Sequence, residues 1–219
     1  MPETVESRER LLDLARDRAL RGHTYSKIAA SGLGMQRLDF EGATFNQVSL
    51  DGADLQGASL AVVTFNRADL RQAHLDGALL YRTAFADSNL TEIDLTGAHL
   101  EDAMVTRAPM MRANLARAKL VSTQFSASDL SRASFAGAVL IKTTFSFPVS
   151  GIESLNRASF AGATLIECDL SGASLQGADL TGAMLIKCNL QSCFLTRALI
   201  EGARLIACNT AGADLPDGL

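Results

Sequence analysis

The sequence predicts an all-β solenoid, a rod in which the chain winds through four short strands per turn behind a short N-terminal helix. The first observation is a period of five. Of the 35 positions spaced five apart from Met35 to Leu205, 34 hold Leu, Phe, Ile, Val or Met. This period fits neither a helix at 3.6 residues nor a strand at two. The chain must therefore repeat one small structural unit, and that unit decides the architecture.

The second observation is a column of small residues that lies two positions before each large one. From Ala43 to Ala203, Ala, Ser, Thr or Cys fills 28 of 33 such positions. Residues two apart in an extended chain point the same way, so both columns face inward. Gly often follows two positions after the large residue, as at Gly42, Gly52 and Gly57, and tolerates the backbone of a corner. Each unit is thus a short strand followed by a bend.

The third observation gives the number of sides. Phe recurs at Phe45, Phe65 and Phe85, and Leu-Ile pairs recur at 165, 185 and 205, always 20 residues apart. Twenty residues are four units, so each coil has four sides, and equivalent residues stack about 4.8 Å apart if neighbouring coils pair as strands. Counted from Met35, the repeats predict between eight and nine coils.

One interruption is visible in this spacing. Residues 132–145 (RASFAGAVLIKTTF) and 157–170 (RASFAGATLIECDL) match at an offset of 25. The five extra residues predict a loop at about 146–154 that leaves the wall and includes Phe147, Pro148 and Gly151. Pro and Gly are typical of such a loop.

The two ends predict a three-part chain: residues 1–34 as an N-terminal helix and cap, 35–215 as the repeat, and 216–219 as a tail. Residues 7–20 form an amphipathic pattern with Ser7 as a plausible N-cap and Gly22 as a stop. We expect this helix to cover the open end of the solenoid. No such helix is predicted at the other end, where an uncovered strand edge invites pairing with a second copy, a homodimer.

Composition narrows the function classes. The 219 residues carry 20 Lys and Arg against 24 Asp and Glu, a net charge of −4, which argues against direct binding of nucleic acid. No run of 18 apolar residues suggests a membrane span. The first ten residues are polar and charged, unlike a secretory signal. We therefore expect a cytoplasmic protein that does not contact membrane.

No residue pattern predicts catalysis. Cys168, Cys188 and Cys208 stack in one column with Cys193 on the adjacent side, but these positions elsewhere hold Ala and Thr. We interpret the thiols as small buried side chains and not as metal ligands. The sequence lacks a nucleophile elbow, a phosphate-binding glycine loop and an HExxH run. We expect no enzyme, no cofactor and no metal.

Outward positions on one side carry an unusual run of apolar residues. The residues are Leu79, Tyr81, Val121, Val139, Ile141, Ile166, Met184, Ile186 and Ile206. An apolar patch on a protein surface commonly marks a contact site. Two other interpretations stay open: β-branched residues favour strands in any case, or the loop at 146–154 folds over the strip.

A second departure from the repeat lies around Pro109, which removes one backbone donor. With Arg107, Met111, Arg112 and Arg117 it forms a candidate recognition patch, because Arg and Met are enriched at interfaces. The alternative is a locally irregular, solvated wall.

The plainest units, Ala53 to Gly57 (ADLQG) and Ala178 to Gly182 (ADLTG), match the pattern A(D/N)LxG. Residues from about 38 to 215 therefore resemble the pentapeptide-repeat family. The resemblance implies a right-handed, four-sided β-helix.

For function, the resemblance implies two classes. One is a non-catalytic scaffold or adaptor of bacterial type that presents its wall to a protein partner, as in accessory proteins of secretion systems, type VI included. The other is a DNA-mimic-like protector of DNA gyrase or topoisomerase IV, of the quinolone-resistance type. Mimicry needs a dense acidic face, and Arg and Lys interrupt the acidic residues here. The scaffold class is therefore preferred, with gyrase as the alternative partner.

Overall fold

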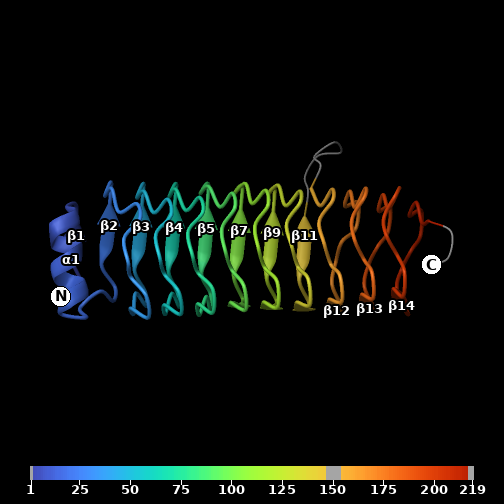
Figure 1. The fold of residues 1–219 in the computed structure, drawn as a ribbon, viewed down its shortest axis with the longest axis horizontal. Helices are drawn as coiled ribbons and strands as arrows, with labels where there is room; N and C mark the ends of the chain where they lie inside the picture. The colour runs from blue at the N-terminus through green and yellow to red at the C-terminus, as the bar shows by residue number, and fades with distance from the viewer. Residues whose placement is uncertain (1, 147–153, 217–219) are drawn as a thin grey trace.

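The computed structural model describes residues 2–146 and 154–216, and these form a rod with one helix at its N-terminal end (Figure 1). The fold is a four-sided β-solenoid, as the sequence predicts, and it has about ten turns. In the described residues the elements are β1 (Thr4–Val5), α1 (Arg8–Arg16), β2 (Thr24–Ser26), β3 (Thr44–Asn46), β4 (Thr64–Asn66), β5 (Ala84–Ala86), β6 (His99–Glu101), β7 (Met104–Thr106), β8 (Lys119–Val121), β9 (Gln124–Ser126), β10 (Val139–Ile141), β11 (Thr144–Ser146), β12 (Thr164–Ile166), β13 (Met184–Ile186) and β14 (Arg204–Ile206).

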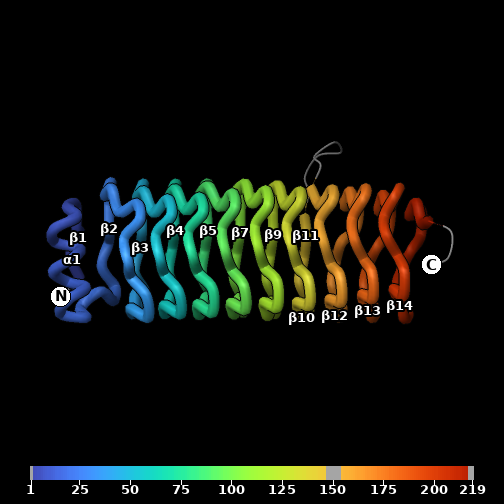
Figure 2. The backbone as a smooth tube through the Cα atoms, viewed as in Figure 1, coloured from blue at the N-terminus to red at the C-terminus, as the bar shows by residue number. Residues whose placement is uncertain are grey.

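We number the four sides in the order in which the chain visits them, so that Phe45, Leu50, Leu55 and Leu60 mark sides 1 to 4 of one coil. Side 1 carries the parallel sheet β1-β2-β3-β4-β5-β7-β9-β11, and side 4 carries the parallel sheet β14-β13-β12-β10-β8-β6. Sides 2 and 3 pair through isolated parallel bridges such as Ser49↔Asp69 and Asp54↔His74. Successive coils appear as evenly spaced turns of the tube (Figure 2).

The register between coils is 20 residues, and it becomes 25 across the predicted loop. Leu140 pairs with Leu165, whereas Leu120 pairs with Leu140. Five extra residues therefore lie between Ser146 and Ser154 without disturbing the pairing on either side. The candidate loop residues Phe147, Pro148 and Gly151 lie outside the described residues.

Aromatic rings fill much of the interior in stacks that follow the rod. The ring centroids of Phe65 lie 4.9 Å from those of both Phe45 and Phe85, with interplanar angles of 14° and 4°. Across the 25-residue step, Phe135 and Phe160 stack at 4.8 Å. These side chains are fully buried, and offset aromatic pairs add attraction beyond the burial of apolar area.

The corners use a left-handed backbone at the second residue after each large apolar one. Gly52 has φ 64°, as expected for Gly, but Arg112 adopts φ 58° at an equivalent corner. Each corner N–H donates to the next coil, from Gly52 to the Arg71 carbonyl at 2.8 Å and from Arg112 to the Ser131 carbonyl at 3.0 Å. These bonds offset the strain of a side chain in this region, so the corners accept charged residues.

Asp and Asn just before the large apolar residue hold the bends. The Asp54 carboxylate accepts a hydrogen bond from the Gln56 N–H at 3.1 Å, and Asp179 accepts one from Thr181 at 2.9 Å. This is the geometry of an Asx turn. These recurring carboxylates therefore stabilise the bends of the wall.

The helix α1 begins at the predicted N-cap but ends earlier than expected. The Ser7 hydroxyl accepts a hydrogen bond from the Arg10 N–H at 3.1 Å. The helix ends at Arg16 instead of near residue 20, because Leu20 already faces inward as a fully buried core residue. Leu11 and Leu14 of the helix are buried against the core.

Coil pairing begins before residue 35, where the sequence placed the start of the repeat. Thr24 pairs with Thr44, and the ring of Tyr25 stacks on Phe45 at 4.9 Å. The frame of five thus extends back through Tyr25 and Ala30. Ala30 hid this extension, because it puts a small residue where a large apolar one is usual. The extra coil explains about ten turns in place of the expected eight to nine.

Candidate interaction surfaces

The predicted apolar strip forms a continuous column on side 4. Side 4 strands pair in register, so that Val121, Ile141, Ile166, Ile186 and Ile206 are successive partners on β8, β10, β12, β13 and β14. We call these five residues the apolar strip. Each of them directly follows the large inward residue of side 4 in its coil, and together they span five coils.

The strip is partly open to solvent. Ile206 is 38% exposed and Val139, next to the strip on β10, is 40% exposed, whereas Ile166 and Ile186 are half-buried. Met184, on β13 beside Ile186, is also half-buried. Charged corner residues such as Lys142, Glu167 and Lys187 follow the strip along one edge. The result is an apolar column with a polar border.

Two of the predicted residues lie apart from the strip. Glu101 pairs with Val121 and so interrupts the column toward the N-terminus. Beyond it, Leu79 and Tyr81 are 49% and 38% exposed. The guanidinium of Arg82 covers the Tyr81 ring at 4.9 Å, a favourable cation–π contact.

Sequence reasoning missed several exposed apolar residues, among them Val62, Phe194 and Leu199, which are 50%, 52% and 59% exposed. Val62 lies next to Tyr81 of the neighbouring coil, since the Val62 N–H donates to the Tyr81 carbonyl at 2.7 Å. Phe194 and Leu199 lie on sides 2 and 3, in the position before the large apolar residue. Asp or Asn is common there, and the loss of that residue is the signal that could have identified them.

The five residues of the candidate recognition patch do not form one surface. Side 2 carries Pro109 and Met111, and the corners on either side of it carry Arg107 and Arg112. Arg117 lies one corner further, between sides 3 and 4. A unit of five residues always moves the chain to the next side. Residues close in sequence are therefore separated around the rod.

Two of these arginines are already paired. Arg107 donates two hydrogen bonds to Asp87, at 2.7 and 3.0 Å, and Arg112 donates one to Glu92 at 2.9 Å. The Arg107 hydrogen bonds hold the pKa of Asp87 below its usual value. Exposed pairs of this kind contribute little to stability. They do reduce the donors that the patch could offer a partner.

The thiols replace hydroxyls inside the wall. The thiol of Cys188 donates to the Leu165 carbonyl at 3.4 Å, and that of Cys193 to the Leu170 carbonyl at 2.9 Å. Thr83, one of the Thr residues at equivalent positions, donates to the Leu60 carbonyl at 2.7 Å in the same way. Burial raises the pKa of the Cys193 thiol to about 11. A protonated thiol that already donates a hydrogen bond to a carbonyl is a poor nucleophile and a poor metal ligand.

Comparison with known families gives the identity of the repeat. A model of pentapeptide repeats matches eight copies, over residues 35–61, 65–102, 109–146, 154–191 and 165–202. The chain belongs to the pentapeptide-repeat family. A search of curated protein sequences gave no significant match.

The chain is similar to solved structures of other pentapeptide-repeat proteins, and the first of those named next shares its fold. Full-length QnrB1, a plasmid-mediated fluoroquinolone resistance protein, is 16% identical with a TM-score of 0.56, covering 89% of this chain and 94% of its own. HetL, involved in regulation of heterocyst differentiation in the cyanobacterium Nostoc sp. strain PCC 7120, is 27% identical with a TM-score of 0.41, covering 98% and 99%. A thylakoid lumen protein of Arabidopsis thaliana is 31% identical with a TM-score of 0.33, covering 54% and 69%.

Pentapeptide-repeat proteins are generally non-catalytic structural or interaction proteins. Within residues 2–146 and 154–216 of this family member, no three His, Cys, Asp or Glu side chains lie close enough to share a metal ion. The only described helix is too short and too polar to cross a bilayer.

Proposed function

We propose that this pentapeptide-repeat protein is a non-catalytic scaffold or adaptor that presents the apolar strip on side 4 to a protein partner. The observation that carries the proposal is the register of Val121, Ile141, Ile166, Ile186 and Ile206 on five adjacent strands. Five stacked side chains at about 4.8 Å per coil extend over roughly 20 Å. An apolar surface of this length supports a contact with another protein.

The surroundings of the strip suit a protein contact. Interfaces commonly combine an apolar centre with a polar rim. Val139 and Met184 widen the centre on one edge, while Lys142, Glu167 and Lys187 provide charges of both signs on the other. Because the strands hold each side chain in place, binding requires little ordering of the rod itself.

The decisive variant is Ile166→Ser with Ile186→Ser, at the middle of the strip. We expect it to abolish association with the partner captured by cross-linking and affinity purification, because the apolar centre is lost. Circular dichroism should be unchanged, since neither residue lies in the inward columns. The matched control is Phe194→Ser with Leu199→Ser, which removes two apolar residues from sides 2 and 3 and should leave association intact.

Association that survives the strip variant would contradict the proposal, and so would equal loss in the control. Sedimentation of the purified protein at high concentration identifies the partner as a second copy or a different protein. A homodimer that dissociates in the strip variant would make the second copy the partner.

The narrower proposal, based on the resemblance of the sequence, is an adaptor of a bacterial secretion system that acts in the cytoplasm. Its test is whether components of such a system co-purify with the wild type and not with the strip variant. The gyrase-protection alternative is separated by a supercoiling assay with a quinolone. Relief of inhibition by the purified protein would reverse the preference. Arg112, Arg132 and Arg157 occupy successive positions on one corner, which does not favour an acidic DNA mimic.

A further inference from the structure

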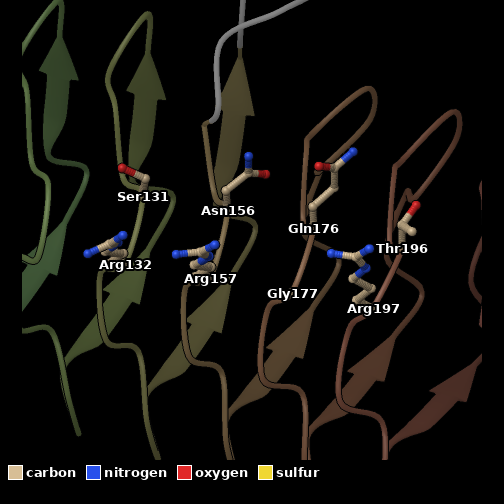
Figure 3. Close-up of a pocket in the computed structure, with 8 residues that line it drawn as sticks. All are labelled: Ser131, Arg132, Asn156, Arg157, Gln176, Gly177, Thr196 and Arg197. Atoms are coloured by element: carbon tan, nitrogen blue, oxygen red, sulfur yellow. The ribbon is translucent and has the colours of Figure 1, made fainter.

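The corner between sides 2 and 3 carries an unusual column of residues. From Arg112 to Arg197, the described part of this column holds Arg112, Arg132, Arg157, Gly177 and Arg197. The three arginines beyond Arg112 line a surface cavity of about 500 Å³ together with Asn156, Gln176 and Gly177. Figure 3 shows Arg132 and Arg157 on adjacent turns of the rod and Arg197 beyond the turn that carries Gly177.

The backbone fixes the spacing of these side chains. The Arg132 N–H donates to the Asn156 carbonyl, the Arg157 N–H to the Gln176 carbonyl and the Gly177 N–H to the Thr196 carbonyl, all at 2.9 Å. The Arg and Gly residues share a left-handed conformation, with φ between 58° and 63°. Their Cα atoms therefore form a regular ladder at about 4.8 Å per coil.

Gly177 creates the recess in this ladder. A Cβ atom built there would lie 3.6 Å from Cγ of Arg157, so the Arg157 stem extends along the face of the glycine. The absence of a side chain leaves space between Arg157 and Arg197, as the close-up shows (Figure 3). A ligand in this space meets cations from both sides.

The charge of the column changes at Arg112. On its N-terminal side, Glu92 accepts hydrogen bonds from Gln72 and Arg112, each at 2.9 Å. Among residues 2–146 and 154–216, no carboxylate lies within 4.0 Å of the Arg132, Arg157 or Arg197 guanidinium.

Two carboxylates accept hydrogen bonds from the lining residues Ser131 and Thr196, and neither is paired with an arginine of the corner. Asp129 accepts from the Ser131 N–H at 2.8 Å, and Asp214 accepts from the Thr196 hydroxyl. A chain of net charge −4 thus concentrates positive charge at one corner.

We propose that this arginine corner binds a linear oligophosphate anion, with phosphate oxygens accepting from Arg132, Arg157 and Arg197. The planar fork of guanidinium matches phosphate and forms strong charge-assisted hydrogen bonds. Asn156 and Gln176 add neutral amide donors beside the cations. The lining holds no aromatic ring, so it offers no surface on which a base could stack. The site therefore recognises the phosphate chain and not a nucleoside.

The test is calorimetric titration of the full chain with inorganic tripolyphosphate at low salt. The variant Arg157→Gln should weaken binding about tenfold, because it removes one charged hydrogen-bond donor. The triple variant of Arg132, Arg157 and Arg197 to Gln should show no binding. Its matched control carries Gln at Arg37, Arg67 and Arg204, which changes the net charge equally on other columns, and it should bind like the wild type.

A second variant tests the recess itself. Gly177→Glu places a carboxylate between Arg157 and Arg197, in the column and conformation that Glu92 already adopts at φ 60°. It should abolish binding. Gly57→Glu is the matched control: its φ is 62° and a Cβ there would lie 3.5 Å from Cγ of Arg37, yet it lies on another corner. It should leave the affinity unchanged.

The outcomes separate the proposal from simple attraction to charge. Absence of binding by the wild type, or binding retained by the triple variant, would overturn it. ATP should bind no more tightly than tripolyphosphate. An affinity for ATP or for single-stranded DNA more than tenfold above that for tripolyphosphate would assign the corner to nucleotides and refute the proposal. Loss of the apolar-strip contact has no bearing on any of these results, because the two surfaces lie on different sides.

Discussion

The two ends of the rod are built differently. At the N-terminal end, β1 adds a pairing to β2 and α1 buries Leu11 and Leu14 over the first coil. In the last described coil, Leu205 and Leu215 occupy inward positions but are only partly buried. In a solenoid each coil contacts only its neighbours. An end coil is therefore only as stable as the element that covers it.

The largest difference between the ends is expected when the same substitution is made in both. Leu11→Asp should lower the local free energy of opening by about 4 kcal/mol, since it places an unpaired charge in a buried position. Leu205→Asp should cost only about 1 kcal/mol, because Leu205 already contacts solvent. Hydrogen exchange of the Tyr25 and Leu185 amides measures the two effects.

Leu11→Ala serves as a milder control, with an expected loss of about 2–3 kcal/mol from the cavity alone. Protection of Leu115, in the middle of the rod, should persist in all three variants. Equal losses at the two ends, or a uniform loss along the rod, would show that end coverage does not determine local stability.

The next effect depends on pH. Burial raises the pKa of Cys193 from 9.0 to about 11. Between these values the unfolded thiol releases its proton while the folded thiol keeps it, so stability falls as pH rises. We expect a loss of about 2 kcal/mol near pH 10.5 relative to pH 7. Urea titrations at both pH values measure it, and Cys193→Ala should remove this contribution.

The N-terminal end responds to pH later. Burial, together with the charge of Glu3, raises the pKa of Tyr25 above its ordinary value of 10.0. The contribution of protonated Tyr25 to stability is lost only as pH rises above 10, where an unfolded tyrosine ionises. The thiol-containing C-terminal half should therefore weaken first on alkaline titration. Earlier loss of structure around Tyr25 would contradict this order.

The smallest effect sharpens the role of α1. Ser7→Ala removes the N-cap hydrogen bond to the Arg10 N–H and should cost about 1 kcal/mol. Exchange of the helix amides should rise, while that of Leu185 stays constant. Ser7→Asp is the control that keeps an acceptor and should retain the wild-type protection. No difference between the Ala and Asp variants would mean that the cap does not hold the helix.

The sequence was sufficient for the repeat because both inward columns must be apolar or small in every coil. The four sides follow from the 20-residue recurrence of Phe and Leu-Ile, and the 25-residue step follows from the offset between residues 132–145 and 157–170. Ala30 and Tyr25 obscured the first coil, since neither belongs to the usual Leu and Phe pattern. Non-glycine corners were also unexpected, because the bonds that stabilise Arg112 come from the next coil and not from its neighbours in sequence.

The candidate sites were harder to predict because surface contacts follow the column and not the chain. Arg107, Arg112 and Arg117 are close in sequence but lie on three different corners. Arg132, Arg157 and Arg197 share one corner although they span more than sixty residues. The ladder would have been visible in the sequence if outward charges had been aligned at 20 and 25 residues.

The constant coil length also constrains how such a chain can change size. Duplication or deletion of 20 residues returns every later side chain to its former side, so that surfaces on both sides of the junction stay aligned. A deletion of five within the wall would instead rotate everything downstream by a quarter turn and divide the apolar strip between two sides. The extra residues between Ser146 and Ser154 avoid this, because Ile141 still meets Ile166. Length variation in such rods should therefore occur in whole circuits or in excursions away from the wall.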